Sequence, residues 1–297
     1  MDIRYVQSFV AVLECGSIAK AARQLDLTSA AVAARIRSLE ELLGVPLLRR
    51  SGRFVRPTAE GLRILENAHV VLRSVRDLQA VAQHVDAQTG ELRLGVFVSA
   101  MTCILPPVLQ RIYSRYPELA IFAEPGSSIN LCHKVASGEL DAAIVVEPQF
   151  AIPKTCEWHL LRSEPLVVVA PRKMKQRQAH ELLQNEPFIR YSRSVSGGQL
   201  ADRYLWDHGI HPRQRLEIDG LLAIVELVAA GIGVSLIPDW SSMWSPSLPV
   251  ACIPLPGEAP VRKIGLIAAR HAPSAALSKA LAGEIADVLR KLGPAAR

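Results

Sequence analysis

The chain has 297 residues, of which 49% are hydrophobic, and its formal net charge is +6. This length predicts two domains, and the apolar content excludes a chain that is disordered over most of its length. The longest apolar stretch, residues 221–238, contains Glu226, Gly231 and Gly233, so it predicts a helix, a turn and a strand rather than a membrane span. The start of the chain does not resemble a signal peptide. The five cysteines form no CxxC pair, which indicates reduced thiols in the cytoplasm.

The basic charge is concentrated near the N-terminus. Residues 1–58 hold nine Lys/Arg and five Asp/Glu, so this short segment carries +4 of the total +6. A basic excess confined to one small module is expected where that module meets phosphate groups.

Apolar residues at helical spacing predict three short helices in the first 45 residues, over 3–13, 18–25 and 29–43. The turn between the second and third is short, which is typical of a helix-turn-helix. Glycine ends a helix well, and serine or threonine starts one well by capping a free amide. The expected boundary residues are Gly16, Ser17, Thr28 and Gly44.

Residues 46–57 form two short extended runs around Ser51 and Gly52, which predicts a hairpin, or wing, with outward-pointing arginines. Thr58 is expected to cap a long helix that runs to about Val85. An apolar heptad stripe along this helix predicts self-association, with packing on its own domain as the alternative. The stripe consists of Ile64, Ala68, Val71, Val75, Leu78, Ala82 and Val85.

From residue 90 onward, short apolar runs alternate with helical segments, which predicts an α/β domain with two lobes. Most runs are continuously apolar, as buried parallel strands are. The predicted strands are 92–98, 119–123, 142–146, 166–170, 188–191, 234–237 and 264–269. The predicted helices are 104–116, 129–137, 198–208, 221–230 and 274–292.

Four motifs together closely resemble the LysR-type transcriptional regulators: residues 16–25 (GSIAKAARQL), 32–44 (VAARIRSLEELLG), 46–50 (PLLRR) and 57–61 (PTAEG). The resemblance implies a winged helix-turn-helix, a dimerising linker helix and a two-lobed effector domain resembling type 2 periplasmic binding proteins. It also implies a cytoplasmic homodimer or homotetramer. The expected bounds are 1–58 for the DNA-binding domain, 59–89 for the linker helix and 90–297 for the effector domain, with lobes at 90–162 plus 266–297 and at 163–265.

The third helix is expected to read DNA, with Val32, Ile36 and Leu39 facing inward. Members of the family often carry Gln, Pro, Ser and a basic residue where this chain has Ser29, Ala30, Ala33 and Ala34. Base reading is therefore expected to depend on Ser29, on alanine methyl groups and on Arg37, for which a phosphate contact is the alternative. The predicted DNA-binding residues are Thr28, Ser29, Ala30, Ala33, Ala34, Arg37, Arg50 and Arg53.

Small polar residues follow three of the predicted strands, where ligands bind in open α/β sheets. The resemblance therefore implies a small polar effector, and Arg190 and Arg193 leave an anion as one candidate. The alternative is that these serines and threonines only cap helices. The predicted effector-binding residues are Ser99, Ala100, Thr102, Ser127, Ser128, Arg193, Ser194 and Ser196.

Other functions find less support. The chain contains none of the GxSxG, HExxH or GxxxxGK[ST] motifs, so no enzyme and no cofactor is expected. His208 and His211 lack an evident third metal ligand. Cys156 and Cys252 are far apart in sequence, which argues against a thiol switch, and Cys103 is expected to be a small buried residue.

The sequence thus predicts a regulator that binds double-stranded DNA and responds to an effector, with no membrane partner and with RNA polymerase left open as a further partner. The alternative is a ligand-independent regulator whose C-terminal domain serves oligomerisation only.

Overall fold

The structure is a computed structural model, and it describes residues 1–51, 54–82, 91–245, 247–270 and 275–291. The chain divides into two compact units. One comprises Met1–Val85 and Ala136–Glu139, and the other comprises Asp86–Val135 and Leu140–Arg297. They are called here the N-terminal and C-terminal units, and each is described by itself. In the described parts of the chain, no helix is both long and apolar enough to span a bilayer.

The N-terminal unit begins with three helices, α1 (Ile3–Cys15), α2 (Ile18–Gln24) and α3 (Ser29–Leu43). Gly16 and Gly44 end α1 and α3 with φ values of 64° and 70°, a backbone conformation that glycine adopts without a steric cost. The predicted helices and their glycine ends are therefore confirmed.

The two predicted N-caps behave differently. The Thr28 hydroxyl accepts a hydrogen bond from the Ala31 amide at 3.1 Å, as a cap should. Ser17 precedes α2, but its side chain makes no capping bond, so its predicted role was wrong. The carbonyl of Ser17 still accepts the first bond of α2, from the amide of Ala21.

The core of this unit forms where α1, α2 and α3 meet. Val32, Ile36 and Leu39 are buried, as the helical spacing predicted. They pack with Phe9 and with Leu47, which lies just before the wing. Because this apolar stripe faces inward, the opposite face of α3 is left at the surface.

The wing consists of β1 (Leu48–Ser51) and β2 (Phe54–Pro57), which pair antiparallel. The Glu40 carboxylate, on α3, accepts hydrogen bonds from the amides of Leu47 and Leu48 at 2.7 and 3.1 Å. This contact ties the end of α3 to the start of the wing. The turn was predicted at Ser51 and Gly52, but Ser51 is the last residue of β1, so this part of the prediction was wrong, and Gly52 lies outside the described residues.

Helix α4 (Ala59–Ala82) follows the wing, and its predicted end near Val85 lies outside the described residues. The Thr58 hydroxyl accepts a bond from the Gly61 amide at 2.9 Å, which confirms the predicted cap. The backbone of α4 approaches the wing so closely that a Cβ at Gly61 would lie 2.1 Å from the carbonyl oxygen of Leu47. This contact explains why glycine stands there.

In the C-terminal unit, one seven-stranded sheet has the order β10-β6-β11-β5-β3-β4, in which β10 is Val250–Pro254, and β9 (Ser235–Pro238) also pairs with β6. Strands β3 (Glu91–Phe97), β4 (Ala120–Gly126) and β5 (Ala142–Val146) are parallel to one another. Strands β6 (Cys156–Pro171) and β11 (Val261–Ala269) are antiparallel to their neighbours. The expectation of parallel strands was therefore wrong for β11 and for the pairs of β6, because apolar residues on both faces reflect burial on two sides and not strand direction.

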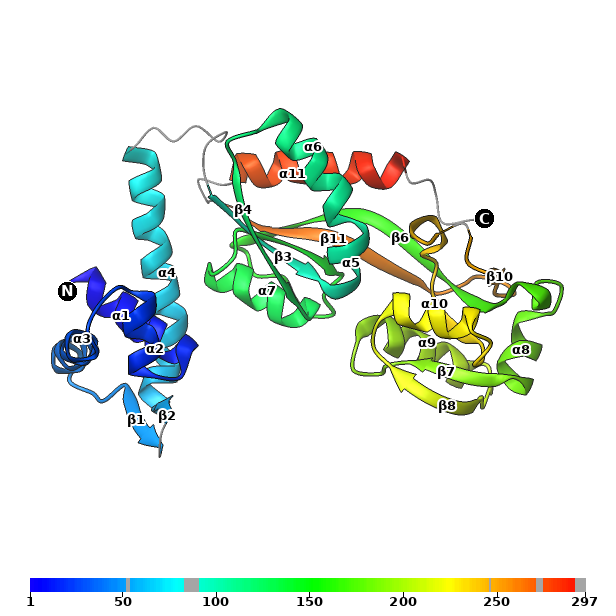
Figure 1. Ribbon diagram of the computed structural model, residues 1–297, viewed down its shortest axis with the longest axis horizontal. Helices are drawn as coiled ribbons and strands as arrows, with labels where there is room; N and C mark the ends of the chain where they lie inside the picture. The colour runs from blue at the N-terminus through cyan, green and yellow to red at the C-terminus, as the bar shows by residue number, and fades with distance from the viewer. Residues whose placement is uncertain (52–53, 83–90, 246, 271–274, 292–297) are drawn as a thin grey trace. The chain divides into compact units, whose positions relative to one another are not determined.

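The first lobe is defined here as β3, β4 and β5 with helices α5 (Val98–Cys103), α6 (Leu105–Arg115), α7 (Ser128–Ser137) and α11 (Ala275–Lys291). Figure 1 shows α6 and α11 on one face of the sheet and α7 on the other. The predicted helix over 104–116 is α6, and α5 precedes it as a separate short helix.

The second lobe is defined as β7 (Pro187–Tyr191), β8 (Arg213–Ile218), β9 (Ser235–Pro238) and β10 (Val250–Pro254) with α8 (Ala179–Asn185), α9 (Ser196–Asp207) and α10 (Leu221–Ala229). Strands β7 and β8 are parallel, and Phe188 forms a bridge to Val234. Short 3-10 turns lie at Arg172–Met174 and Ser241–Met243.

Strand β6 belongs to both lobes. Its first part pairs with β11 as far as Pro165, and its last part pairs with β9 and β10. Only residues 166–170 of this strand were predicted, because its first part carries alternating polar residues. Strands β8 and β10 and helix α8 were also missed, since β8 is mostly polar and the other two are short.

Candidate functional site

The exposed face of α3 carries the side chains expected to meet DNA. Thr28, Ser29 and Ala30 are exposed at its N-terminal end, where free amides also point outward. One and two turns further along, Ala34 and Arg37 are exposed on the same side, and Ala33 is half-buried. The structure thus gathers these six residues on one continuous surface.

The wing adds positive charge to the same unit. Arg49 and Arg56 are directly opposite each other in the β1–β2 register, and both are exposed. Like charges at opposed positions repel each other, and an anionic partner would relieve this repulsion. Arg50 lies on β1, opposite Val55, and Arg53 lies outside the described residues. The prediction did not include Arg49 and Arg56, because a turn at Ser51 and Gly52 does not place these two residues opposite each other.

The two halves of the apolar stripe of α4 lie in different environments. Ile64 and Ala68 pack against the core of the N-terminal unit. Val71 and Leu78 are 36% and 69% exposed, and Val75 is half-buried. Ala82 is the last residue of α4, and its side chain lies outside the described part. The first half of the stripe is therefore used within its own unit, and the second half leaves apolar side chains at the surface.

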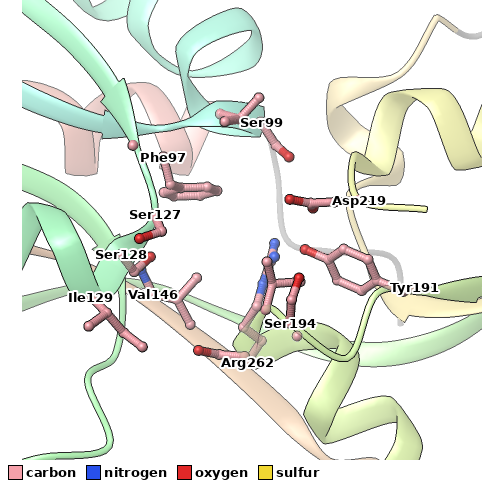
Figure 2. A pocket seen from close by; sticks show the side chains of 15 residues that line it. Phe97, Ser99, Ser127, Ser128, Ile129, Val146, Tyr191, Ser194, Asp219 and Arg262 are labelled. Carbon is pink, nitrogen blue, oxygen red and sulfur yellow. The ribbon is translucent and has the colours of Figure 1, made fainter. Parts of the chain in front are cut away.

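The C-terminal unit contains a cavity of about 140 Å³ where its two lobes meet (Figure 2). The ends of β3, β4 and β5 contribute from the first lobe. The ends of β7 and β8 and the start of α9 contribute from the second, and β11 crosses beneath. The lining residues are Phe97, Val98, Ser99, Gly126, Ser127, Ser128, Ile129, Val146, Tyr191, Ser194, Val195, Ser196, Gly197, Asp219 and Arg262.

The structure brings five of the eight predicted effector-binding residues to this cavity and leaves three outside its lining. The five are Ser99, Ser127, Ser128, Ser194 and Ser196. Ala100 is fully buried in the core, and the exposed Thr102 donates its hydroxyl to the carbonyl of Ser99 at 3.1 Å. Arg193 donates its Nη2 to Glu217 at 2.8 Å, so its charge is paired outside the cavity. Arg190 is likewise paired, with Asp202.

Several cavity serines already make structural bonds. Ser127 accepts a bond from the Asn130 amide at 3.3 Å, which caps α7, and Ser128 accepts one from the Val146 amide at 3.0 Å. In the part of the chain that the structure describes, the hydroxyls of Ser99 and Ser196 make no hydrogen bond to another group. These two hydroxyls are therefore able to form hydrogen bonds with a ligand in the cavity.

Arg262, on β11, was not predicted and is the most deeply buried charge at the cavity. Its Nε and Nη2 donate to one oxygen of Glu164 at 2.8 and 2.5 Å, and Arg162 lies 3.7 Å from the other oxygen. The exposed fractions of the Arg262 and Glu164 side chains are 2% and 0%. Burial raises the pKa of Glu164, and the two guanidinium groups oppose this shift. One sequence signal could have pointed to Arg262: it is an arginine near the start of a strand whose second half is apolar.

Aromatic side chains surround this ion pair. The Arg262 guanidinium lies 5.4 Å from the ring centre of Trp240 and 5.8 Å from that of Phe97. Tyr191 is buried beside it, and burial raises the pKa of the Tyr191 hydroxyl, which therefore stays protonated at neutral pH. The cavity is thus lined by a charged group that is held in apolar surroundings.

The remaining predictions concern thiols, histidines and glycines. Burial raises the pKa of Cys132 to about 11 and that of Cys252 to about 12, and it also raises the pKa of Cys103. Cys103 was expected to be buried, but it is half-buried. The described residues contain no cluster of three or more metal-binding side chains. His208 instead stacks on Tyr204, with ring centres 4.0 Å apart.

Gly231 has a φ of 77° just after α10, which confirms the expected turn into a strand. That strand is β9, which begins at Ser235.

A winged helix-turn-helix in one unit and a two-lobed α/β unit with a cavity between its lobes define the class of effector-responsive transcription regulators. The protein-family model "Bacterial regulatory helix-turn-helix protein, lysR family" matches residues 3–62, and the protein-family model "LysR substrate binding domain" matches residues 85–290. The chain belongs to the LysR family of DNA-binding transcriptional regulators, which have an effector-binding substrate domain.

Curated relatives and solved structures agree. The chain is 29% identical over 238 residues to the HTH-type transcriptional regulator CzcR of Bacillus thuringiensis, covering 80% of this chain and 78% of that protein. It is 31% identical over 244 residues to the regulator IlvR of Caulobacter vibrioides, covering 80% and 82%. Both relatives are named as HTH-type transcriptional regulators.

A full-length OxyR variant from Pseudomonas aeruginosa has the same fold, with a TM-score of 0.76, 22% identity and coverage of 96% of this chain and 94% of that one. CbnR in complex with its target DNA gives a TM-score of 0.63 at 21% identity, covering 99% and 100%. At these identities, the structural likeness shows the fold alone.

Proposed function

We propose that the chain recognises operator DNA through α3 and the wing, and that a small polar effector in the C-terminal cavity modulates this binding. The observation that best supports this proposal is the exposed surface of α3. This surface includes the free backbone amides at the start of the helix, Ser29 and Arg37, and it belongs to the same unit as the basic wing. Operator contacts are assigned to Thr28, Ser29, Ala30, Ala33, Ala34, Arg37, Arg50 and Arg53.

Three of these residues are alanines, and this limits how bases can be read. An alanine side chain has no hydrogen-bonding group, but its methyl group can pack on the methyl group of thymine. Ser29 and Arg37 are then the side chains that can form hydrogen bonds with base edges. We therefore expect an operator in which thymine methyl groups matter and in which loss of Arg37 has a large effect.

The effector is assigned to the cavity between the lobes, an anion being one candidate chemistry. The free hydroxyls of Ser99 and Ser196 and the adjacent Arg262 support this assignment, because such cavities bind ligands through a few well-placed polar groups. Self-association is assigned to the exposed second half of the α4 stripe. Members of the family act as oligomers in the cell, and we assign this chain to the cytoplasm with RNA polymerase as a candidate partner.

The assigned bounds are residues 1–58 for DNA binding, 59–89 for the linker helix and 90–297 for the effector domain. Its lobes are 90–162 plus 266–297 and 163–265. The pairing of β6 with strands of both lobes supports a division within that strand.

The test is binding of the full-length protein to a duplex from its own upstream region and to a scrambled duplex, over a salt series. Selective binding that weakens steeply with salt is expected. Loss of Arg50 and Arg53 to alanine should reduce the salt slope by about one for each lost phosphate contact. A double variant of Arg213 and Arg290, which carry the same charge in the C-terminal unit, serves as the matched control and should bind normally.

A protein that binds neither duplex at low salt contradicts the proposal. An unchanged salt slope after loss of Arg50 and Arg53 removes the wing from the DNA interface. Retained affinity after Arg37→Ala would place sequence reading elsewhere on α3.

A further inference from the structure

Two side chains of opposite charge face the effector cavity from different strands. Asp219 follows β8, and Arg262 comes from β11. Figure 2 shows the Asp219 carboxylate pointing into the cavity near the Tyr191 hydroxyl, and it shows the nitrogens of Arg262 pointing toward the same space. Among the residues that the structure describes, Asp219 makes no hydrogen bond or ion pair. The cavity therefore offers an unpaired carboxylate beside a guanidinium.

The position of the guanidinium is fixed from below. Arg262 uses Nε and Nη2 to bond Glu164, whose side chain is inaccessible to solvent. Because these bonds and the flanking rings of Trp240 and Phe97 hold the guanidinium, the positive group cannot swing away to meet Asp219. The two opposite charges at the cavity wall thus stay apart, each able to meet its own ligand group.

The charges in the cavity and beneath it balance. Arg262 and Asp219 line the wall, and Glu164 and Arg162 lie underneath, which makes two positive and two negative groups. A bare anion that approached Arg262 would also meet Asp219, and a bare cation that approached Asp219 would meet Arg262. Each would lie close to a cavity group of its own sign, and this repulsion is costly in a partly desolvated site.

We propose that the effector is a small zwitterion of the α-amino acid class. Its ammonium group pairs with Asp219, and its carboxylate lies against Arg262 and the free hydroxyls of Ser99 and Ser196. The side chain of the ligand lies on the apolar part of the wall, which includes Val146. This inference rests on the proposed effector site and narrows its ligand from polar molecules in general to one charge pattern.

The size of the cavity limits the ligand further. Its volume of about 140 Å³ is close to that of an engineered protein cavity, about 150 Å³, that accepts benzene. A molecule with a short side chain fits this space, and one with a long or bicyclic side chain does not. We therefore expect amino acids of the size of valine to bind, and arginine and tryptophan not to bind.

The experiment uses the full-length protein and measures binding by calorimetry and by the shift in melting temperature. The probes are the proteinogenic L-amino acids, each at the same concentration. For each amino acid that binds, two analogues follow, one without the amine and one without the carboxylate; for valine these are isovalerate and isobutylamine. Since each analogue loses one charged contact, both should bind at least about tenfold more weakly than the amino acid.

Asp219→Asn tests the assigned pairing, and Glu258→Gln is its matched control because it removes the same charge from an exposed residue outside the cavity lining. Asp219→Asn should weaken amino acid binding by about tenfold or more and should leave isovalerate binding unchanged or stronger. Glu258→Gln should change neither. The melting temperature without ligand shows whether each variant is folded.

Three outcomes overturn the inference: equal binding of an amino acid and its deaminated analogue, unchanged amino acid affinity in Asp219→Asn with the variant folded, or no binding by any amino acid in the panel. Duplex binding measured on the same preparations separates this inference from the proposed function. Selective DNA binding with any of these three outcomes refutes the zwitterion alone, whereas loss of DNA binding in the unmodified protein refutes the regulator.

Discussion

The two candidate sites are built in opposite ways. The DNA-facing surface of the N-terminal unit comes from one short run of chain, in which the cap Thr28, the exposed face of α3 and the wing follow one another. The cavity of the C-terminal unit joins strand ends separated by more than 160 residues, from Phe97 to Arg262. The first site depends on local helix and turn chemistry, and the second depends on long-range pairing and on one buried ion pair. Substitutions should therefore damage the two sites by different routes.

Tryptophan fluorescence can follow one unit without the other. All four tryptophans lie in the C-terminal unit, so their emission reports its unfolding, whereas circular dichroism reports both units. They are Trp158, Trp206, Trp240 and Trp244.

The largest effect is expected at the buried ion pair. Arg262→Met leaves the carboxylate of Glu164 buried with only Arg162 nearby, at 3.7 Å, and should cost about 3–5 kcal/mol of unfolding free energy. Denaturant unfolding followed by tryptophan emission measures this loss. Adding Glu164→Gln to Arg262→Met should recover part of it, because the buried charge is then gone. An Arg262→Met variant as stable as the parent would show that the ion pair does not stabilise the C-terminal unit.

A smaller effect is expected at Gly61, in the N-terminal unit. A Cβ there meets the carbonyl oxygen of Leu47 at 2.1 Å, so Gly61→Ala should cost about 1–3 kcal/mol as α4 moves away from the wing. The control is Gly283→Ala in α11, where a Cβ meets nothing within 4 Å and alanine favours the helix. The melting temperature measured by circular dichroism should fall only for Gly61→Ala, and the unfolding followed by tryptophan emission should be unchanged. Equal effects of the two substitutions would argue against the close approach at Gly61.

The smallest effect is expected from thiol reagents. Burial raises the pKa of Cys132 to about 11 and that of Cys252 to about 12, so both thiols stay protonated and react slowly near neutral pH. Iodoacetamide labelling followed by mass spectrometry should modify both residues far more slowly in the native protein than in the denatured one. Equal rates would show that these thiols are accessible.

The same two thiols predict a loss of stability in alkali. The pKa of each is higher in the folded chain than the ordinary value of 9.0, so the folded state holds protons that the unfolded state releases. Their contribution to stability is complete below pH 9 and falls as the pH rises toward 11 and 12. A Cys132→Ala, Cys252→Ala double variant should lose this part of the pH dependence.

Much of the N-terminal unit was determined by its sequence alone. Helices α1, α2 and α3 begin and end close to their predicted bounds, because glycines, a threonine cap and apolar spacing act within one helix. Among the five residues expected at the boundaries of α1 to α4, only the Ser17 cap was wrong. The exposed surface of α3 followed directly, since the buried stripe of Val32, Ile36 and Leu39 leaves one face for solvent.

Only the tertiary structure decided the cavity. The serines after strand ends were found by their local pattern, but nothing local distinguishes Arg262, which lines the cavity, from Arg193, which is paired outside it. That choice depends on which acidic group lies nearest, Glu164 from β6 or Glu217 from β8, and β6 reaches β11 only through sheet pairing across about a hundred residues of chain. Ion pairs between residues so far apart in the sequence depend on how the strands pair in the folded sheet. The periodicity and spacing of the sequence therefore do not predict them.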